Sequence, residues 1–293
     1  MKFTTGRIVL ISAFFAGSIS LYSNPAGEQV VSGSATFSRD GGVLEVVTGT
    51  DSTIIDWENF SIGVDELTNF VQPGIDSAVL NRVVGSLPTN ILGSLVSNGR
   101  VAIINPNGVV IDSSGMIDTR GFVGSTLDVT NESFLANGDL AFSGQSGAGV
   151  TNNGVILARE GDVFLLGREV SNTGEIIAEN GNVGLGAGSR VILKKDGDDH
   201  FYIEVAESQE GDRVDNSGRI SALREDLRNG ADPYAQAMYT GENQDISGVT
   251  LQRGGGVFLS AGGEGLVVQS GEIDVSSETT GGCLLYTSDA ADE

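Results

Sequence analysis

Histidine, cysteine and closely spaced acidic residues most often carry catalysis or hold metal ions, and this sequence offers few of them. His200 is the only histidine among 293 residues, which removes most metal clusters and any Ser-His-Asp triad. Asp196, Asp198 and Asp199 faintly resemble a calcium loop, but no glutamate follows at a defined distal position. We interpret these three as the solvated tip of a hairpin, and we predict no catalytic residue, no cofactor and no metal site.

The polar residues that do recur belong to a repeat of twenty residues. Val150–Ala158 matches Val170–Ala178 at an offset of twenty, and Val214–Ala222 is a third copy. Each copy contains an asparagine two residues before a glycine: Asn152, Asn172 and Asn216. A fixed period of this length is typical of solenoids, in which successive copies stack on one another.

Apolar and polar residues alternate within each copy, which indicates strands rather than helices. One short strand cannot bury its apolar face, but coils stacked about 4.8 Å apart can. We therefore predict an all-β chain, a right-handed parallel β-helix with coils of roughly 20 residues. Ile156, Ile176 and Ile220 would stack inside it, and the three asparagines would form a hydrogen-bonded ladder at a corner. A left-handed β-helix would show a six-residue period, which this sequence does not show. A β-sandwich would not repeat the same residue types at a fixed spacing.

Two insertions interrupt the repeat, near 189–212 and near 221–245. The first is predicted to be a β-hairpin with its turn at Asp196 and Gly197. The second begins at Ser221 and has the apolar spacing of a short helix. The strand pattern resumes at Gly256–Ala261.

The two ends of the chain have a different character. Residues 1–23 combine Lys2 and Arg7 with an apolar stretch too short to cross a bilayer, which predicts a signal peptide cleaved after Ser20 or Ser23. Residues 283–293 can be back-translated into the end of a transposase sequencing adapter. We predict that this tail is an assembly scar and that the natural chain continues; a genuine strand is the alternative.

Composition narrows the class of partner. Cys283, the only cysteine, lies in that tail, so the rest of the chain has none. Exported proteins often contain disulfides, and their absence suits passage through a narrow pore as an unfolded thread. The net charge of −23 argues against nucleic acid as a partner.

A series of segments between Gln29 and Val129 carries a family resemblance. They are Val30–Phe37, Ile55–Gly63 with its Trp-x-x-Phe-x-Ile-Gly pattern, Asn69–Pro73, Val79–Val83, Ile91–Gly93 and Gly99–Val109. In this order they resemble the N-terminal secretion (TPS) domain of two-partner secretion exoproteins, the filamentous haemagglutinin group.

The resemblance implies a partner and a location. Residues 24–130 would be the secretion domain, forming the N-terminal cap and first coils of the β-helix, and residues 131–282 would continue it. Such a domain crosses the periplasm after its Sec signal peptide is removed, and an outer-membrane β-barrel transporter recognises it through POTRA domains. It would be the start of a secreted or cell-surface adhesin or haemagglutinin of a Gram-negative bacterium, with host-cell or glycan receptors bound further downstream.

The secretion motifs are the candidate site. Many members carry Asn-Pro-Asn-Leu before Asn-Pro-Asn-Gly-Ile; the nearest counterpart of the first here is Leu-Asn-Arg, and valine replaces the isoleucine of the second. The candidate residues are Leu80, Asn81 and Arg82, together with Asn105, Pro106, Asn107, Gly108 and Val109. A simple β-turn explains Asn105–Gly108 equally well, so recognition motif and turn both remain open.

Two alternative functions remain open beside export by a partner. An autotransporter passenger would have a β-barrel fused at its C-terminus. A carbohydrate-active β-helix enzyme would need paired carboxylates in a groove, or calcium-binding acids with a basic residue. Lys194 and Lys195 lie together in this sequence, but the other basic residues are scattered along it.

Overall fold

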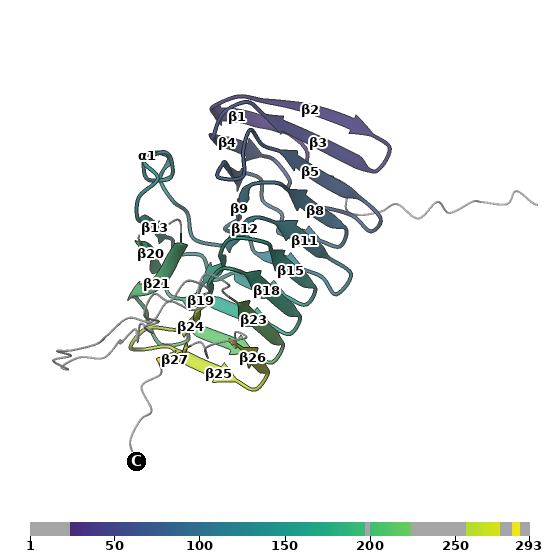
Figure 1. Cartoon of the computed structure of the whole chain (residues 1–293). Helices are drawn as coiled ribbons and strands as arrows, with labels where there is room; N and C mark the ends of the chain where they lie inside the picture. The colour runs from purple at the N-terminus through teal and green to yellow at the C-terminus, as the bar shows by residue number, and fades with distance from the viewer. Residues whose placement is uncertain (1–23, 197–199, 224–255, 276–282, 288–293) are drawn as a thin grey trace, which may run out of the picture.

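The computed structural model describes residues 24–196, 200–223, 256–275 and 283–287, and these form one stack of β coils (Figure 1). Three long sheets run along the stack: the first coils contribute strands to two of them, and from β7 onward each coil contributes one strand to each of the three in turn. The fold predicted from the repeat, a parallel β-helix, is confirmed.

Sheet 1 contains, in spatial order, β1 (Gln29–Ser32), β4 (Ser52–Trp57), β6 (Ala78–Val83), β9 (Arg100–Ile104), β12 (Gly121–Ser125), β16 (Val163–Gly167), β19 (Val183–Ala187), β24 (Gly256–Ser260) and β27 (Cys283–Thr287). Sheet 2 contains β2 (Ala35–Asp40), β3 (Val43–Thr48), β5 (Leu67–Val71), β8 (Ser94–Ser97), β11 (Met116–Thr119), β15 (Val155–Ala158), β18 (Glu175–Glu179), β23 (Arg219–Leu223) and β26 (Glu272–Asp274). Sheet 3 contains β7 (Thr89–Ile91), β10 (Val109–Ile111), β14 (Gly149–Asn152), β17 (Glu169–Asn172), β22 (Arg213–Asn216) and β25 (Leu266–Gln269).

The register between coils explains the twenty-residue repeat. Val150 pairs with Val170, and Ile156 pairs with Ile176, so equivalent residues of the repeat lie directly above one another. Ile156, Ile176 and Ile220 are fully buried in the interior between the three sheets. In these coils the interior is therefore formed by stacking identical side chains, because each parallel strand aligns its inward positions with those of the next.

The recurring glycine of the repeat lies at a corner where successive coils touch. A Cβ on Gly174 would lie 2.2 Å from the carbonyl oxygen of Gly154, and a Cβ on Gly218 would lie 2.1 Å from that of Gly174. Any side chain there would push the coils apart, so the glycine is required by the close approach of backbones.

Antiparallel strands cap the N-terminal end of the stack. β1 pairs antiparallel with β4, and β2 pairs antiparallel with β3. Beneath this cap, Trp57 packs edge-on against Phe37 and Phe60, with ring centroids 5.7 Å and 5.4 Å apart. Trp57 and Phe60 are fully buried, so they belong to the core under the cap.

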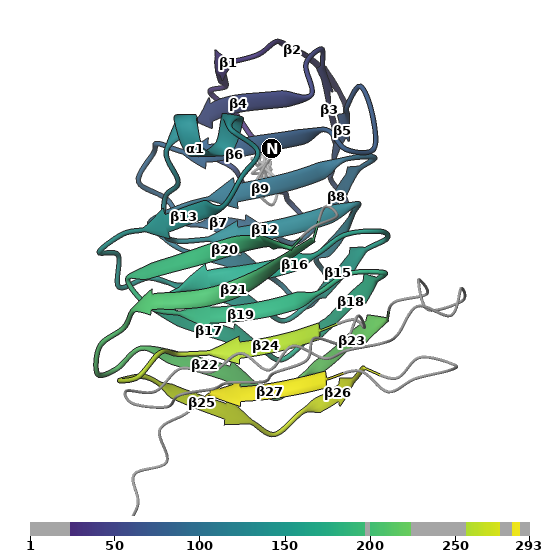
Figure 2. The ribbon, with the colours of Figure 1, turned by 60° about the vertical axis from the view of Figure 1, so that its left-hand side comes forward.

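A fourth, outer sheet covers part of the outward face of sheet 1 (Figure 2). It consists of β13 (Leu140–Ser143), β20 (Arg190–Asp196) and β21 (His200–Glu207), all antiparallel. The hairpin predicted near 189–212 is confirmed as β20 and β21, and the strand predicted to resume at Gly256 is β24. Gly184 and Gly186 face the hairpin, and a Cβ on Gly186 would lie 2.3 Å from the side chain of Ile203.

The second predicted insertion begins as a strand and not as a helix. Ser221 belongs to strand β23, so the helix expected to begin there is wrong at its start, and residues 224–245 lie outside the described residues. Helical spacing misled because the inward–outward alternation of β23 continues the repeat of β18. The structure instead forms α1 (Asn131–Leu135), capped by the Thr130 side chain, which accepts from the Ser133 N–H. Among the described residues no helix is long and apolar enough to span a membrane.

The tail predicted to be a scar contributes a strand. Cys283–Thr287 forms β27 and pairs in parallel with β24. An apolar pentapeptide can add to the open edge of a stack whatever its origin, so both interpretations of residues 283–293 remain predictions, as does the domain boundary at 130.

Candidate functional site

The segment Asn105–Gly108 forms a tight turn between β9 and β10. The Gly108 N–H donates to the Asn105 carbonyl oxygen at 3.0 Å, closing a four-residue turn with proline second and asparagine third. Gly108 has a φ of +117°, a conformation that favours glycine. Pro106 and Asn107 are exposed at the tip, while Asn105 is fully buried.

The buried carboxamide of Asn105 joins this turn to the preceding coil. Its Nδ2 donates to the Leu87 carbonyl oxygen and to Thr89 Oγ1, both at 3.0 Å. Its Oδ1 accepts from the backbone N–H of Asn107 at 2.9 Å. Asn107 in turn donates from Nδ2 to the Gly85 carbonyl oxygen at 2.9 Å. The turn is thus held from within by one side chain and fixed to residues 85–89 by two.

Val109 begins the strand that follows the turn and is fully buried. It pairs with Thr89 of β7 below and with Val150 of β14 above. The turn therefore sets the start of β10, the strand through which sheet 3 passes from the first coils to the regular repeat. A β-branched residue of this size fills the same interior position that isoleucine would.

The triplet Leu80-Asn81-Arg82 lies in β6, and its alternate residues point to opposite faces. Leu80 faces outward and is buried in the second core beneath the outer segment. Asn81 is fully buried and accepts from Trp57 Nε1 at 2.9 Å while donating to the Ala102 carbonyl oxygen at 3.2 Å. Asn81 therefore satisfies the only polar atom of the buried indole and connects three successive strands of sheet 1.

Arg82 ties the segment around α1 to the first coils. Its Nε donates to Asp128 at 3.0 Å, and its Nη2 donates to the Val129 carbonyl oxygen at 2.8 Å. Its Nη1 donates to Asn131 Oδ1 at 3.0 Å and lies 3.5 Å from Asp56 Oδ1. A planar guanidinium suits this role because its donors diverge toward several acceptors.

The structure also brings the three repeat asparagines together. Asn152 Nδ2 donates to Asn172 Oδ1 at 2.8 Å, and Asn172 Nδ2 donates to Asn216 Oδ1 at 2.7 Å. Asn216 continues the chain of bonds to Gln269 at 2.7 Å. The ladder begins at Asn152 in β14, the strand that pairs with β10, and it continues through the following coils away from the Asn105 turn.

Two buried acids that sequence reasoning missed attach the outer sheet and its flanks. Asp162 accepts from the backbone N–H of Phe201 at 2.7 Å and lies 2.8 Å from Nδ1 of His200. Asp212, fully buried, pairs with Arg168 at 2.6 Å. The detectable signal was that Asp162 occupies the same place in its coil as Asn182 in the next, directly after a corner glycine.

Surface ion pairs fasten the remaining outer elements. The backbone N–H of Lys195, and then the ammonium of Lys194, hold the pKa of Asp139 below its ordinary value. At the cap, hydrogen bonds from Arg39 hold the pKa of Glu28 below its ordinary value. Among the described residues no cluster of histidine, cysteine and acidic side chains could hold a metal ion.

The turn, the triplet and the ladder are structural contacts between coils, and none of them forms a catalytic arrangement. The family model of the TPS secretion domain matches residues 22–275 of this chain. The chain belongs to the TPS secretion domain family. Proteins of this family are two-partner secretion exoproteins, which Gram-negative bacteria secrete and which are generally non-catalytic.

Individual relatives of this secretion domain come from Haemophilus influenzae. A heme/hemopexin-binding protein of strain Rd is 33% identical over 211 residues, covering 68% of this chain and 23% of that protein. A second protein of that name is 31% identical over 131 residues, covering 44% and 14%. The chain thus spans less than a quarter of the length of either relative.

A solved secretion domain shows the same architecture. The HMW1 secretion domain of Haemophilus influenzae superposes with a TM-score of 0.64 at 25% identity, covering 90% of this chain and 74% of that one. The filamentous hemagglutinin secretion domain matches with a TM-score of 0.47 at 13% identity, covering 90% and 98%.

Proposed function

We propose that this secretion domain directs export of a longer exoprotein through a dedicated outer-membrane β-barrel transporter with POTRA domains. After a Sec signal peptide has brought it to the periplasm, the transporter would deliver it to the cell surface of a Gram-negative bacterium. The observation that carries the proposal is the turn at Asn105, whose buried carboxamide fixes one coil to the coil before it.

The geometry of that turn supports a role early in folding. Asn105 and Asn107 reach back to residues 85–89, which lie 16 to 22 residues earlier in the chain. These contacts need only one finished coil, and they close a short loop, so their cost in chain entropy is small. Once β10 is set, each later coil finds a strand edge to pair with.

The unfolded state offers the transporter a different set of features. Before the coils form, the strands of residues 24–130 have unpaired backbone groups, which can add to an exposed sheet edge of a POTRA domain. The same asparagines, freed from their contacts, would be available for recognition. Folding outside the cell then withdraws these strands one coil at a time, which favours outward movement.

Secretion of two matched asparagine variants tests this proposal. Asn105→Ala and Asn172→Ala each remove one fully buried amide from a corner of the stack. Co-expressed with the transporter, Asn105→Ala should lower the secreted fraction at least tenfold, while Asn172→Ala should change it less than twofold. Equal secretion of both variants would contradict a role for the turn in export.

The downstream part of the exoprotein would determine what the cell-surface fibre binds. We propose that this chain begins a filamentous adhesin or haemagglutinin whose later coils bind host-cell or glycan receptors. The similarity to the HMW1 secretion domain supports this proposal. Cell-binding assays with the complete exoprotein and with a version that ends at residue 282 test it: the complete protein should bind, and the shortened one should not.

A further inference from the structure

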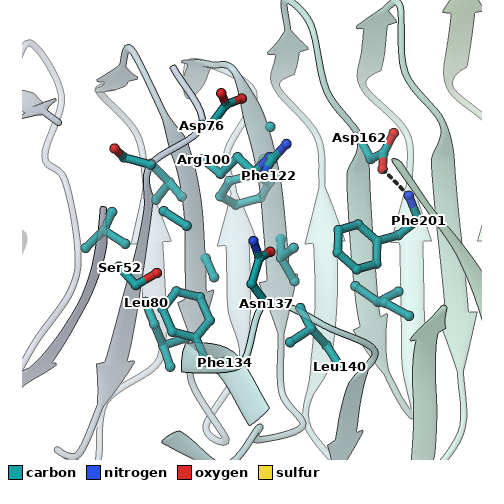
Figure 3. A pocket seen from close by; sticks show the side chains of 18 of the residues that line it. Ser52, Asp76, Leu80, Arg100, Phe122, Phe134, Asn137, Leu140, Asp162 and Phe201 are labelled. Atoms are coloured by element: carbon teal, nitrogen blue, oxygen red, sulfur yellow. Dashed lines mark hydrogen bonds between the residues drawn. The ribbon is translucent and has the colours of Figure 1, made fainter. Parts of the chain in front are cut away.

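The outward face of sheet 1 is covered over the later coils but hollow over the earlier ones. A cavity of about 510 Å³ lies there, between sheet 1 and the segment that carries α1 and β13. Leu80, Ala102 and Val123 line it from sheet 1. Phe134 and Leu140 line it from the outer segment (Figure 3). A volume of this size with an apolar lining is typical of a binding site.

A strand edge is exposed beside this cavity. β20 pairs with one side of β13, and among the described residues the other side is bridged only at Asp128 and Ser143. Ser143 exchanges both backbone hydrogen bonds with Asp128, at 2.9 Å and 3.0 Å. In an antiparallel strand the backbone groups of residues two apart point the same way. The N–H and C=O of Ala141 therefore point away from β20, toward the side where no strand follows.

The rim of the cavity carries acidic side chains. Asp51 accepts from Ser77 Oγ at 3.2 Å and forms no ion pair with any described residue. Asp76 pairs with Arg120, which holds the pKa of Asp76 below its ordinary value, yet its side chain is 70% exposed. Arg100 is the one cation among the described residues that line the cavity. Because Asp76 is already paired, Asp51 is the carboxylate at this end that favours a positively charged group on whatever fills the cavity.

We propose that this cavity and the edge of β13 bind an extended segment of another polypeptide. Its backbone pairs with Ala141 as a fourth strand of the outer sheet, its alternate apolar side chains fill the space above Leu80 and Val123, and a lysine or arginine meets Asp51. A small apolar molecule would fill the cavity without pairing the Ala141 backbone, whereas an extended strand satisfies both. This site is a property of the folded domain and does not depend on the export function.

A peptide of alternating lysine and valine tests the site. The acetylated, amidated heptapeptide KVKVKVK, carrying a fluorophore, is titrated with the secreted chain, and anisotropy gives the dissociation constant. The comparison peptide has the same residues but methylated amide nitrogens on one edge, which keeps its charge and removes its strand-pairing donors. We expect the methylated peptide to bind at least tenfold more weakly.

Variants of the chain complete the test. Ala141→Pro removes the N–H on the free edge, where an edge strand tolerates proline, and should weaken binding at least tenfold. Asp51→Asn should weaken it severalfold, whereas Asp118→Asn, which makes the same charge change in sheet 2, should leave it unchanged. If the methylated peptide and Ala141→Pro leave the affinity unchanged, or if no peptide binds, the proposal is overturned. Equal losses for both aspartate variants would likewise indicate attraction to the overall negative charge only.

Discussion

The first coils and the later coils of this secretion domain are held together in different ways. From β14 onward, residues of the same type stack on one another even where an insertion lengthens a coil: Val150 lies beside Val170, and Val170 lies beside Val214. In the first coils the paired residues differ in type, because Ile54 pairs with Leu80 and Leu80 with Ala102. There the stack depends on contacts that occur once, such as Trp57 with Asn81 and the turn at Asn105.

The two kinds of contact have different consequences for recognition by a partner and for the stability of the stack. A ladder of identical residues stabilises a coil but makes each coil resemble its neighbours, so a partner could not tell one from another. Contacts that occur once give the first coils a sequence of their own. We infer that recognition during export depends on the first coils and that stability of the finished stack depends mainly on the later ones.

The largest effect is expected from the interior of the regular coils. Ile176→Ala should lower the free energy of unfolding by about 4 kcal/mol, because a fully buried side chain is lost between two others that cannot close the gap. Denaturant unfolding of the secreted chain measures it. Ile177→Ala, which trims the half-exposed neighbour in the same strand, should cost less than about 1 kcal/mol; equal costs would refute internal stacking.

The asparagine ladder should come next. Asn172→Ala removes the buried acceptor of Asn152 Nδ2 and the buried donor to Asn216 Oδ1, so we expect a loss of about 3 kcal/mol. Thermal unfolding compares it with Asn153→Ala, an exposed neighbour at the same corner, which should change stability by less than about 0.5 kcal/mol. Equal thermal stability of the two variants would show that the ladder contributes nothing to the stability of the stack.

A smaller loss is expected at the single contact between Trp57 and Asn81. Trp57→Phe leaves the buried Asn81 Oδ1 without its donor and should cost about 2 kcal/mol. Adding Asn81→Leu should recover part of that loss, because removing both partners leaves no unpaired acceptor. A double-mutant cycle by denaturant unfolding measures the coupling, and strict additivity of the two substitutions would exclude it.

The smallest effect is expected at the cap, and it depends on pH. Arg39 lowers the pKa of Glu28 in the folded state, so the pair stabilises the fold above the ordinary pKa of a glutamate, and that contribution is lost as the pH falls through the lowered pKa. Solvent screening limits it to about 0.5 kcal/mol. Glu28→Gln should be less stable than the parent chain at pH 7 and equal to it at pH 2, by thermal unfolding; a constant difference across that range would rule the pair out.

The regular coils could be predicted from the sequence because the repeat is itself the register. Asn172 and Ile176 recur at an offset of twenty, and that offset fixes which residue lies above which. The hairpin β20–β21 was also predictable, since its alternation and its Asp-Gly turn are local signals. The helix α1 was not, because it is only five residues long and its capping threonine resembles many loop positions.

The contacts of the candidate site could be located but not described from the sequence. The turn at Asn105 was visible as turn chemistry, yet nothing in the sequence indicated that its side chain reaches Leu87 and Thr89. Asn81 and Trp57 lie 24 residues apart in coils of unequal length, so no fixed offset links them. The repeat placed Asp162 at the same position in its coil as Asn182, but its contacts with His200 and Phe201 could be described only once the hairpin that covers it had been placed.

The separation of export from stability is tested most directly by measuring both for the same variants. For Asn105→Ala, Trp57→Phe, Asn172→Ala and Ile176→Ala, the secreted fraction is plotted against the loss in unfolding free energy. We predict two groups: the variants in the first coils lose secretion at any stability cost, and those in the later coils keep it despite larger costs. A single curve through all four, with secretion falling only as stability falls, would contradict the account.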